Sequence, residues 1–184
     1  ETVVSYHEVK PDQLTYSEGY EPVSSSYSYD ALPQEGEKLL YTKILESCYD
    51  ISPNQTEETK RYPMPKIELS GYSLSEAEVR TTSKALSDDH PEIFWLTGTM
   101  GYYCDENTTE IQIYSNFSPD EVSKRINAMR SVANEFYATV PDGLSAFERE
   151  VMVHDFLIDH IEYDKDVDTI NLDNNSPDTY TAYG

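Results

Sequence analysis

The chain has 184 residues, which is enough for one domain of ordinary size and too few for two full ones. Its 13 Lys and Arg residues and 35 Asp and Glu residues give a net charge of −22. Coulomb repulsion therefore disfavours binding to nucleic acid or to an anionic membrane. No uncharged apolar run approaches the ~20 residues of a membrane-spanning helix, so we expect no transmembrane segment.

The first 35 residues differ in composition from the segment that follows them. They contain seven acidic residues, one Lys and five Tyr, and their apolar residues follow no helical spacing. This composition predicts a flexible acidic leader or linker over residues 1–35. Regular apolar spacing begins at Gly36 and continues to Glu162, so we expect the folded body there. Residues 163–184 are polar and acidic again, and they end without a helix cap or a strand end, which indicates a cut chain.

The first half of the body contains two helical patterns and one strand pattern. Residues 37–49 predict an amphipathic helix with these residues on its inward face: Leu40, Tyr41, Ile44, Leu45 and Cys48. Alternation of polar and apolar residues predicts a short strand over 66–70. Ser75 and Glu78 have the spacing of a capping box, which predicts a helix that runs to about Ser87. Its predicted inward residues are Ala77, Thr81, Ala85 and Leu86.

The second half of the body combines a sheet with two further helices. Aromatic and β-branched residues predict an antiparallel meander of three segments: 93–96, 100–104 and 110–114. A helix is predicted after the Ser118 cap, with these residues inward: Val122, Ile126, Met129, Ala133, Phe136 and Val140. Ser145 and Glu148 cap a last helix, whose predicted apolar face is Phe147, Val151, His154, Ile158 and Ile161. We therefore predict an α+β fold in which helices pack on a small antiparallel β-meander.

Titratable residues are densest on that last helix, as His154, Asp155, Asp159, His160 and Glu162. Only the two aspartates share a helical face, and the sequence His-Glu-x-x-His is absent. We interpret His154 as packed beside the meander and the aspartates as solvated, with a metal site as the alternative. The run Asp164, Asp166 and Asp168 resembles a calcium loop, but Thr169 and Asn175 stand where Gly and Glu are expected. A hydrated acidic loop is the preferred interpretation.

The two cysteines, Cys48 and Cys104, do not have the spacing of a metal site. We interpret them as two buried thiols, with a single disulfide as the alternative. A nucleophilic cysteine favours a helix N-terminus near a His, but Cys48 is at the far end of its predicted helix and Cys104 is in a predicted strand. The sequence therefore assigns no residue a catalytic, cofactor-binding or metal-binding role.

Three stretches together resemble a known family: residues 85–96, residues 150–164 and the final Thr181-Ala182-Tyr183-Gly184. They are similar to the opening of the transglutaminase-like domain, and to the region before it, in secreted proteins of anaerobic Gram-positive bacteria. The resemblance covers roughly residues 36–184. It implies a papain-like fold with a Cys-His-Asp triad, in which a segment like Ala182 to Gly184 precedes the nucleophilic Cys.

On this resemblance, residues 36–143 are an α+β accessory domain, and residues 144–184 are the opening helix and acidic loop of the catalytic core. The triad would lie beyond Gly184, so we expect this chain to be the non-catalytic N-terminal portion of a secreted or surface-anchored bacterial cysteine enzyme. The partner would be a protein or peptide substrate of the parent enzyme, or a cell-wall component, without a cofactor. The alternative function is a cell-envelope binding module that contacts a protein or a glycan.

Overall fold

The computed structural model describes residues 7–8 and 26–161, and it divides the chain into two compact units. The first unit comprises Glu1–Lys124 and the second Arg125–Gly184, so the division falls inside a helix. The helices are α1 Tyr27–Ala31, α2 Glu35–Ser47, α3 Glu76–Asp89, α4 Pro119–Tyr137 and α5 Ala146–His160.

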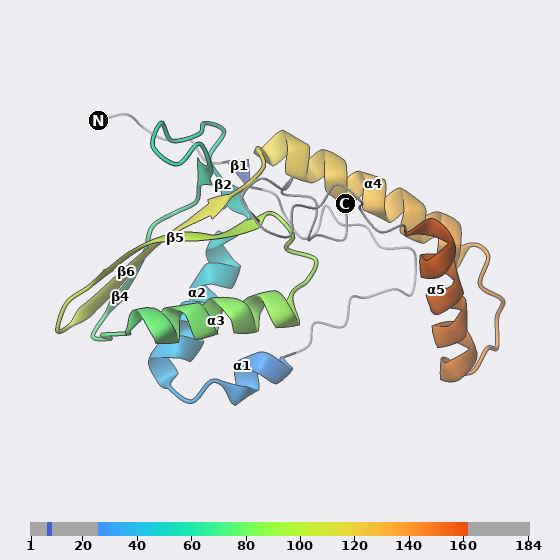
Figure 1. Cartoon of the computed structure of the whole chain (residues 1–184), viewed down its shortest axis with the longest axis horizontal. Helices are drawn as coiled ribbons and strands as arrows, with labels where there is room; N and C mark the ends of the chain where they lie inside the picture. Colours follow the sequence, from blue (N-terminus) through green and yellow to red (C-terminus); the bar gives the residue numbers. More distant parts are fainter. Residues whose placement is uncertain (1–6, 9–25, 162–184) are drawn as a thin grey trace, which may run out of the picture. The chain divides into compact units, whose positions relative to one another are not determined.

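Three helices of the first unit lie on one side of its sheet (Figure 1). The helix α2 buries Leu40, Tyr41 and Ile44, as the apolar spacing predicted. The predicted capping box of α3 is present, with the Ser75 hydroxyl accepting from the Glu78 N–H and the Glu78 carboxylate accepting from the Ser75 N–H. The buried face of α3 is rotated about the helix axis relative to the predicted face, because Val79 and Thr82 are buried in place of Ala77 and Thr81.

The helix α1 lies within the segment that was predicted to be a flexible leader or linker. Its sequence has no helical apolar spacing, and none of its residues is buried. The Asp89 carboxylate on α3 accepts hydrogen bonds from the backbone N–H groups of Ser28 and Tyr29, at the start of this helix. A tertiary contact therefore caps the helix, which is why its own sequence does not reveal it.

The sheet is antiparallel and is built around one central strand. Its strands are β3 Tyr62–Pro63, β4 Ile67–Ser70, β5 Leu96–Cys104 and β6 Thr108–Ser115. All three other strands pair with β6, and β5 and β6 form a hairpin in which Met100 faces Ile113 and Tyr102 faces Ile111. A separate pair joins β1 His7–Glu8 to β2 Asp50–Ile51. The sheet is thus not a simple meander, because α3 lies between β4 and β5 in the chain.

The core of the first unit fills the space between the helices and the sheet. Alternate residues of β4 and β6 point into it, including Ile67, Leu69, Ile111 and Ile113. The segment 93–95 was predicted as a strand, but it precedes β5 as a buried turn. Its Trp95 is 1% exposed, and the indole N–H donates to the carbonyl of Cys48 at 2.8 Å. This bond joins the end of α2 to the start of the hairpin.

The second unit contains the larger part of α4 together with α5. Phe136 of α4 is buried, and its ring centroid lies 4.7 Å from that of Phe156 on α5. The predicted apolar face of α5 is wrong, because Phe147, Val151 and Ile158 are exposed on that side. Val153, Phe156 and Leu157 line a groove with α4, where Phe156 is half-buried and Val153 and Leu157 are 40% and 44% exposed. The prediction failed because α5 is apolar on two sides, and spacing alone does not choose between them.

Within the described residues, five helices and a small antiparallel sheet confirm the predicted α+β class. Among the helices that the structure describes, none has both the length and the apolar character that a membrane crossing requires.

Candidate functional site

The histidines and carboxylates predicted on the last helix do not form a site in the described part of the chain. His154 is exposed rather than packed, and its Nδ1 lies 3.1 Å from Oδ1 of the equally exposed Asp155. His160 stacks on Phe156, with 4.1 Å between ring centroids, and its Nδ1 lies 2.8 Å from the Phe156 carbonyl oxygen. Over residues 7–8 and 26–161, no three His, Cys, Asp or Glu residues are grouped as metal ligands. Glu162 and the loop 164–175 lie outside the described residues.

The two thiols have opposite environments. Cys48 is completely buried at the C-terminus of α2, where burial raises its pKa. Cys104 ends β5 and is half-exposed, so the prediction that both thiols are buried is correct only for Cys48. Both are free, and no disulfide joins them.

The surroundings of Cys104 favour its thiolate. Its sulfur lies 3.2 Å from the Ser73 hydroxyl and 3.7 Å from the Thr109 hydroxyl, and these hydrogen bonds lower its pKa. The neighbouring Tyr102 donates its hydroxyl to the carbonyl of Leu74 at 2.6 Å. The sequence missed this environment, because Ser73 is 31 residues away in the chain. The partners that the structure gives Cys104 are hydroxyl and carbonyl groups and include no general base, so nucleophilic catalysis is not assigned to it.

We expect iodoacetamide to alkylate Cys104 in the native protein at least about 100-fold faster than Cys48, because Cys48 reacts only after the structure opens. Intact-mass spectrometry should show one added group under native conditions and two in urea. Ser73→Ala should slow the reaction of Cys104 near neutral pH, because the loss of this hydrogen bond raises the thiol pKa. Equal labelling rates of the two native thiols would contradict the described burial.

A buried polar cluster joins α1, α2 and α3. Asp89 is 3% exposed, and its carboxylate accepts from the N–H groups of Ser28 and Tyr29, at 2.9 and 2.8 Å, and from the Tyr41 hydroxyl at 3.0 Å. Burial by itself raises the pKa of Asp89, but these three hydrogen bonds outweigh it and hold the pKa below its usual value. All three donors belong to the protein itself, so the cluster has a structural role.

One surface groove lies between α4 and α5 within the second unit. It has a volume of about 420 Å³ and an apolar lining: Ala128, Met129, Val132, Ala133, Phe136, Tyr137, Val153, Phe156 and Leu157. The opposite side of α5 is also apolar and exposed, with exposed fractions of 72% for Phe147, 63% for Ile158 and 62% for Ile161. Isolated apolar residues are common on protein surfaces, but a helix that is apolar on both sides is typical of a core.

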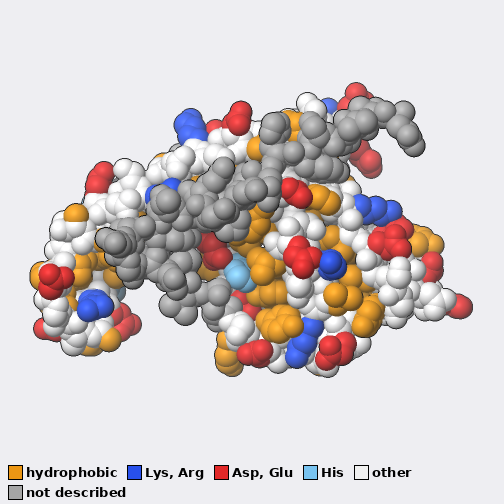
Figure 2. Space-filling model, turned by 180° about the vertical axis from the view of Figure 1, so that it is seen from behind, with side chains coloured by type: hydrophobic (Ala, Val, Ile, Leu, Met, Phe, Trp, Pro, Cys, Tyr) orange, Lys and Arg blue, Asp and Glu red, His pale blue; other side chains and the backbone are white. Residues whose placement is uncertain are grey.

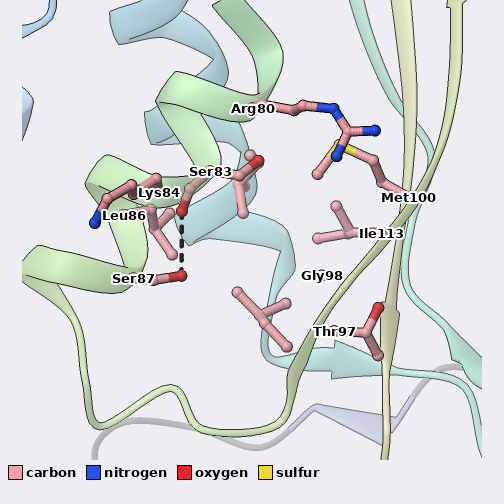
Figure 3. A pocket seen from close by; sticks show the side chains of 11 residues that line it. Arg80, Ser83, Lys84, Leu86, Ser87, Thr97, Gly98, Met100 and Ile113 are labelled. Carbon is pink, nitrogen blue, oxygen red and sulfur yellow. Dashed lines mark hydrogen bonds between the residues drawn. The ribbon is translucent and has the colours of Figure 1, made fainter. Parts of the chain in front are cut away.

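Another surface groove lies between α3 and β5, with a volume of about 270 Å³ (Figure 3). Its lining combines apolar side chains with the hydroxyls of Ser83, Ser87 and Thr97 and with Arg80. Arg80 extends across one end of the groove toward Met100, whereas Lys84 points away from it (Figure 3). Elsewhere the surface is rich in acidic side chains, which are scattered among apolar ones on the face shown in Figure 2.

Comparison of the chain with protein-family models, with curated proteins and with solved structures found no match.

Proposed function

We propose that this chain is the non-catalytic N-terminal portion of a secreted, transglutaminase-like cysteine enzyme of bacteria, whose catalytic triad lies beyond Gly184. The observation that carries this proposal is the exposed apolar face of α5, defined by Phe147, Val151, Ile158 and Ile161. The resemblance of residues 150–164 to the opening helix of that catalytic domain supports the same assignment.

The exposed face of α5 requires a cover in the complete protein. One side of the helix packs on α4 through Phe156, and among the described residues none buries the four residues of the opposite face. Transfer of an apolar side chain from water into a core contributes about 1.5 to 3 kcal/mol when burial is complete. The remainder of a papain-like core, following this helix in the chain, would supply that cover.

The parent enzyme would catalyse acyl transfer. A cysteine thiolate would attack the carbonyl carbon of a glutamine side chain or a peptide bond, expelling ammonia or an amine and leaving a thioester. An amine or water would then resolve the thioester and regenerate the thiol. Neither Cys48 nor Cys104 has the neighbours that this chemistry requires. The described residues therefore contribute to the parent by packing and binding.

We expect the 184-residue chain to show no turnover in assays of amine incorporation into a glutamine-rich protein or of peptide hydrolysis, because its described residues do not bring together a thiolate, a base and an orienting group. The comparison is a longer protein that continues past Gly184, tested in the same assays. Activity of the longer protein alone supports the proposal. Turnover by the 184-residue chain that disappears after alkylation of Cys104 would overturn it.

A pair of substitutions tests the role of α5 separately from activity. Phe147→Glu with Ile158→Glu should leave the stability of the 184-residue chain nearly unchanged, because both side chains are already exposed. The same pair should lower the melting temperature of the longer protein, where we expect the face to be buried. Glu150→Gln, at an exposed polar position of the same helix, is the matched control. Equal, small effects in both proteins would argue against a covering core.

The binding module is the second candidate, and exposed tyrosines favour it. Tyr27, Tyr102 and Tyr103 are 82%, 38% and 54% exposed, and tyrosine supplies amphipathic contact area at binding surfaces. The gene sequence after the codon for Gly184 separates the two candidates. A Cys near the start of a predicted helix, followed by His and Asp, supports the enzyme, whereas their absence favours the module.

A further inference from the structure

We propose that the groove between α3 and β5 binds an extended peptide segment, which adds a strand to β5, inserts an apolar side chain into the groove and places an acidic side chain on Arg80. This inference goes beyond the proposed function and does not depend on it, because peptide binding is measured without turnover.

The free edge of β5 supplies the backbone partner. Among the described residues, β5 pairs with β6 alone, and no hydrogen bond from another described element reaches the opposite edge of its nine residues. An exposed strand edge presents a row of unpaired N–H and C=O groups, which an extended peptide can satisfy. Gly98 is exposed at this edge, but the N–H and C=O groups of Thr99 already bond the Thr97 hydroxyl. We therefore place the pairing on the regular part of the strand, from Met100 to Cys104.

The groove supplies a pocket for one face of that peptide. Its apolar floor comes from four elements and consists of Ile44, Leu86, Leu96, Met100 and Ile113. Alternate residues of an extended peptide point to the same side, so an apolar residue can enter the groove while the residue two positions along reaches its rim. The hydroxyls of Ser83, Ser87 and Thr97 already donate to backbone carbonyls at 3.0, 3.1 and 2.7 Å. They therefore offer acceptors but not donors to a ligand.

Arg80 gives the groove its preference for an acid. Its guanidinium bonds Glu76 at 2.6 and 2.9 Å, but both side chains are largely exposed, so exchange of this partner costs little. A guanidinium binds a carboxylate through two parallel hydrogen bonds. The net charge of −22 repels an acidic peptide at long range, but salt screens that repulsion beyond about 8 Å at physiological ionic strength.

The test uses a fluorescein-labelled peptide, GSTLTDTSG, whose Leu and Asp are two positions apart, and fluorescence anisotropy with the 184-residue chain. Arg80→Glu should weaken binding about tenfold or more, because it replaces an attractive contact with a repulsive one. Lys43→Glu makes the same charge change at an exposed position of α2 and should leave the affinity for the peptide unchanged. Gly98→Leu should weaken binding, because it adds a bulky side chain at a residue that lines the groove, and the backbone has room for it because a Cβ at Gly98 meets no atom within 4 Å.

Peptides with changed sequences test the mode of binding. Replacement of Asp by Lys or of Leu by Ser should weaken binding, and replacement of the central Thr by Pro should do so by removing a strand N–H. In amide NMR spectra, the peptide should shift the resonances of residues 97–104. Equal affinity of the Asp and Lys peptides, or an unchanged affinity of the Arg80→Glu variant, would overturn the proposal. So would self-association of the chain through β5, which would assign the edge to a second copy.

Discussion

Asp89→Ala is expected to lower the free energy of unfolding by about 3 kcal/mol, because it removes the acceptor of three buried or partly buried hydrogen bonds. Hydrogen bonds to a charged acceptor contribute about 1.5 to 3 kcal/mol each, but the full sum is not expected. The five-residue helix α1 can detach and expose its N–H groups to water, which limits the loss. The Tyr41 hydroxyl, on the buried side of α2, then loses its acceptor.

Urea unfolding followed by circular dichroism measures this effect, and two variants serve as comparisons. Asp88→Ala removes the neighbouring carboxylate, which is exposed and paired with Lys84, and should cost no more than about 0.5 kcal/mol. Tyr41→Phe removes one of the three donors and should have an intermediate effect. Amide hydrogen exchange should show the loss of protection at Ser28 and Tyr29 in Asp89→Ala. A stability change as small as that of Asp88→Ala would refute the role of Asp89 as the cap of α1.

The same carboxylate makes stability depend on pH. Its pKa in the folded protein is lower than in the unfolded chain, so the unfolded state binds its proton first as the pH falls. The stabilisation is therefore complete above the unfolded pKa and is lost as the pH falls through the folded pKa. The difference in unfolding free energy between the native protein and Asp89→Asn should shrink in acid. A constant difference from neutral to acidic pH would contradict an ionised Asp89.

Trp95→Ala is expected to cost about 3 to 5 kcal/mol, the range for removing a large aromatic side chain from a packed core. Trp95 is 1% exposed, and its ring lies 5.2 Å from Phe94 and 5.4 Å from Tyr49, measured between centroids. Its removal leaves a cavity and also leaves the Cys48 carbonyl without its indole donor. Because α2 and the hairpin meet at this side chain, we expect the whole first unit to lose stability.

Trp95→Phe separates packing from hydrogen bonding. It retains an aromatic ring but removes the N–H, and we expect a loss of about 1 to 2 kcal/mol from the unpaired carbonyl and the smaller ring. Tyr103→Ala, at an exposed position of β5, should change stability by less than about 0.5 kcal/mol. Thermal unfolding by calorimetry compares the three variants. A loss for Trp95→Ala no larger than that for Tyr103→Ala would show that Trp95 is not in the core.

Local signals in the sequence were sufficient for several elements. The capping boxes at Ser75 and Ser145 predicted where α3 and α5 begin, because the two partners of each box are three residues apart. The short connection between residues 104 and 109 predicted the hairpin of β5 and β6, and alternation predicted β4. In each case the interacting groups are neighbours along the chain, so spacing alone reveals them.

The sequence by itself determined the α+β class, the starts of its main helices and the acidic surface. Only the tertiary structure decided the groups that distant segments bring together. Asp89 caps a helix 60 residues earlier, and Ser73 stabilises the thiolate of a cysteine 31 residues later. Spacing also did not choose which of the two apolar sides of α5 contacts α4, because both have helical periodicity. Periodicity describes how a single element divides its residues between faces, whereas partners, exposure and grooves depend on which elements pack together.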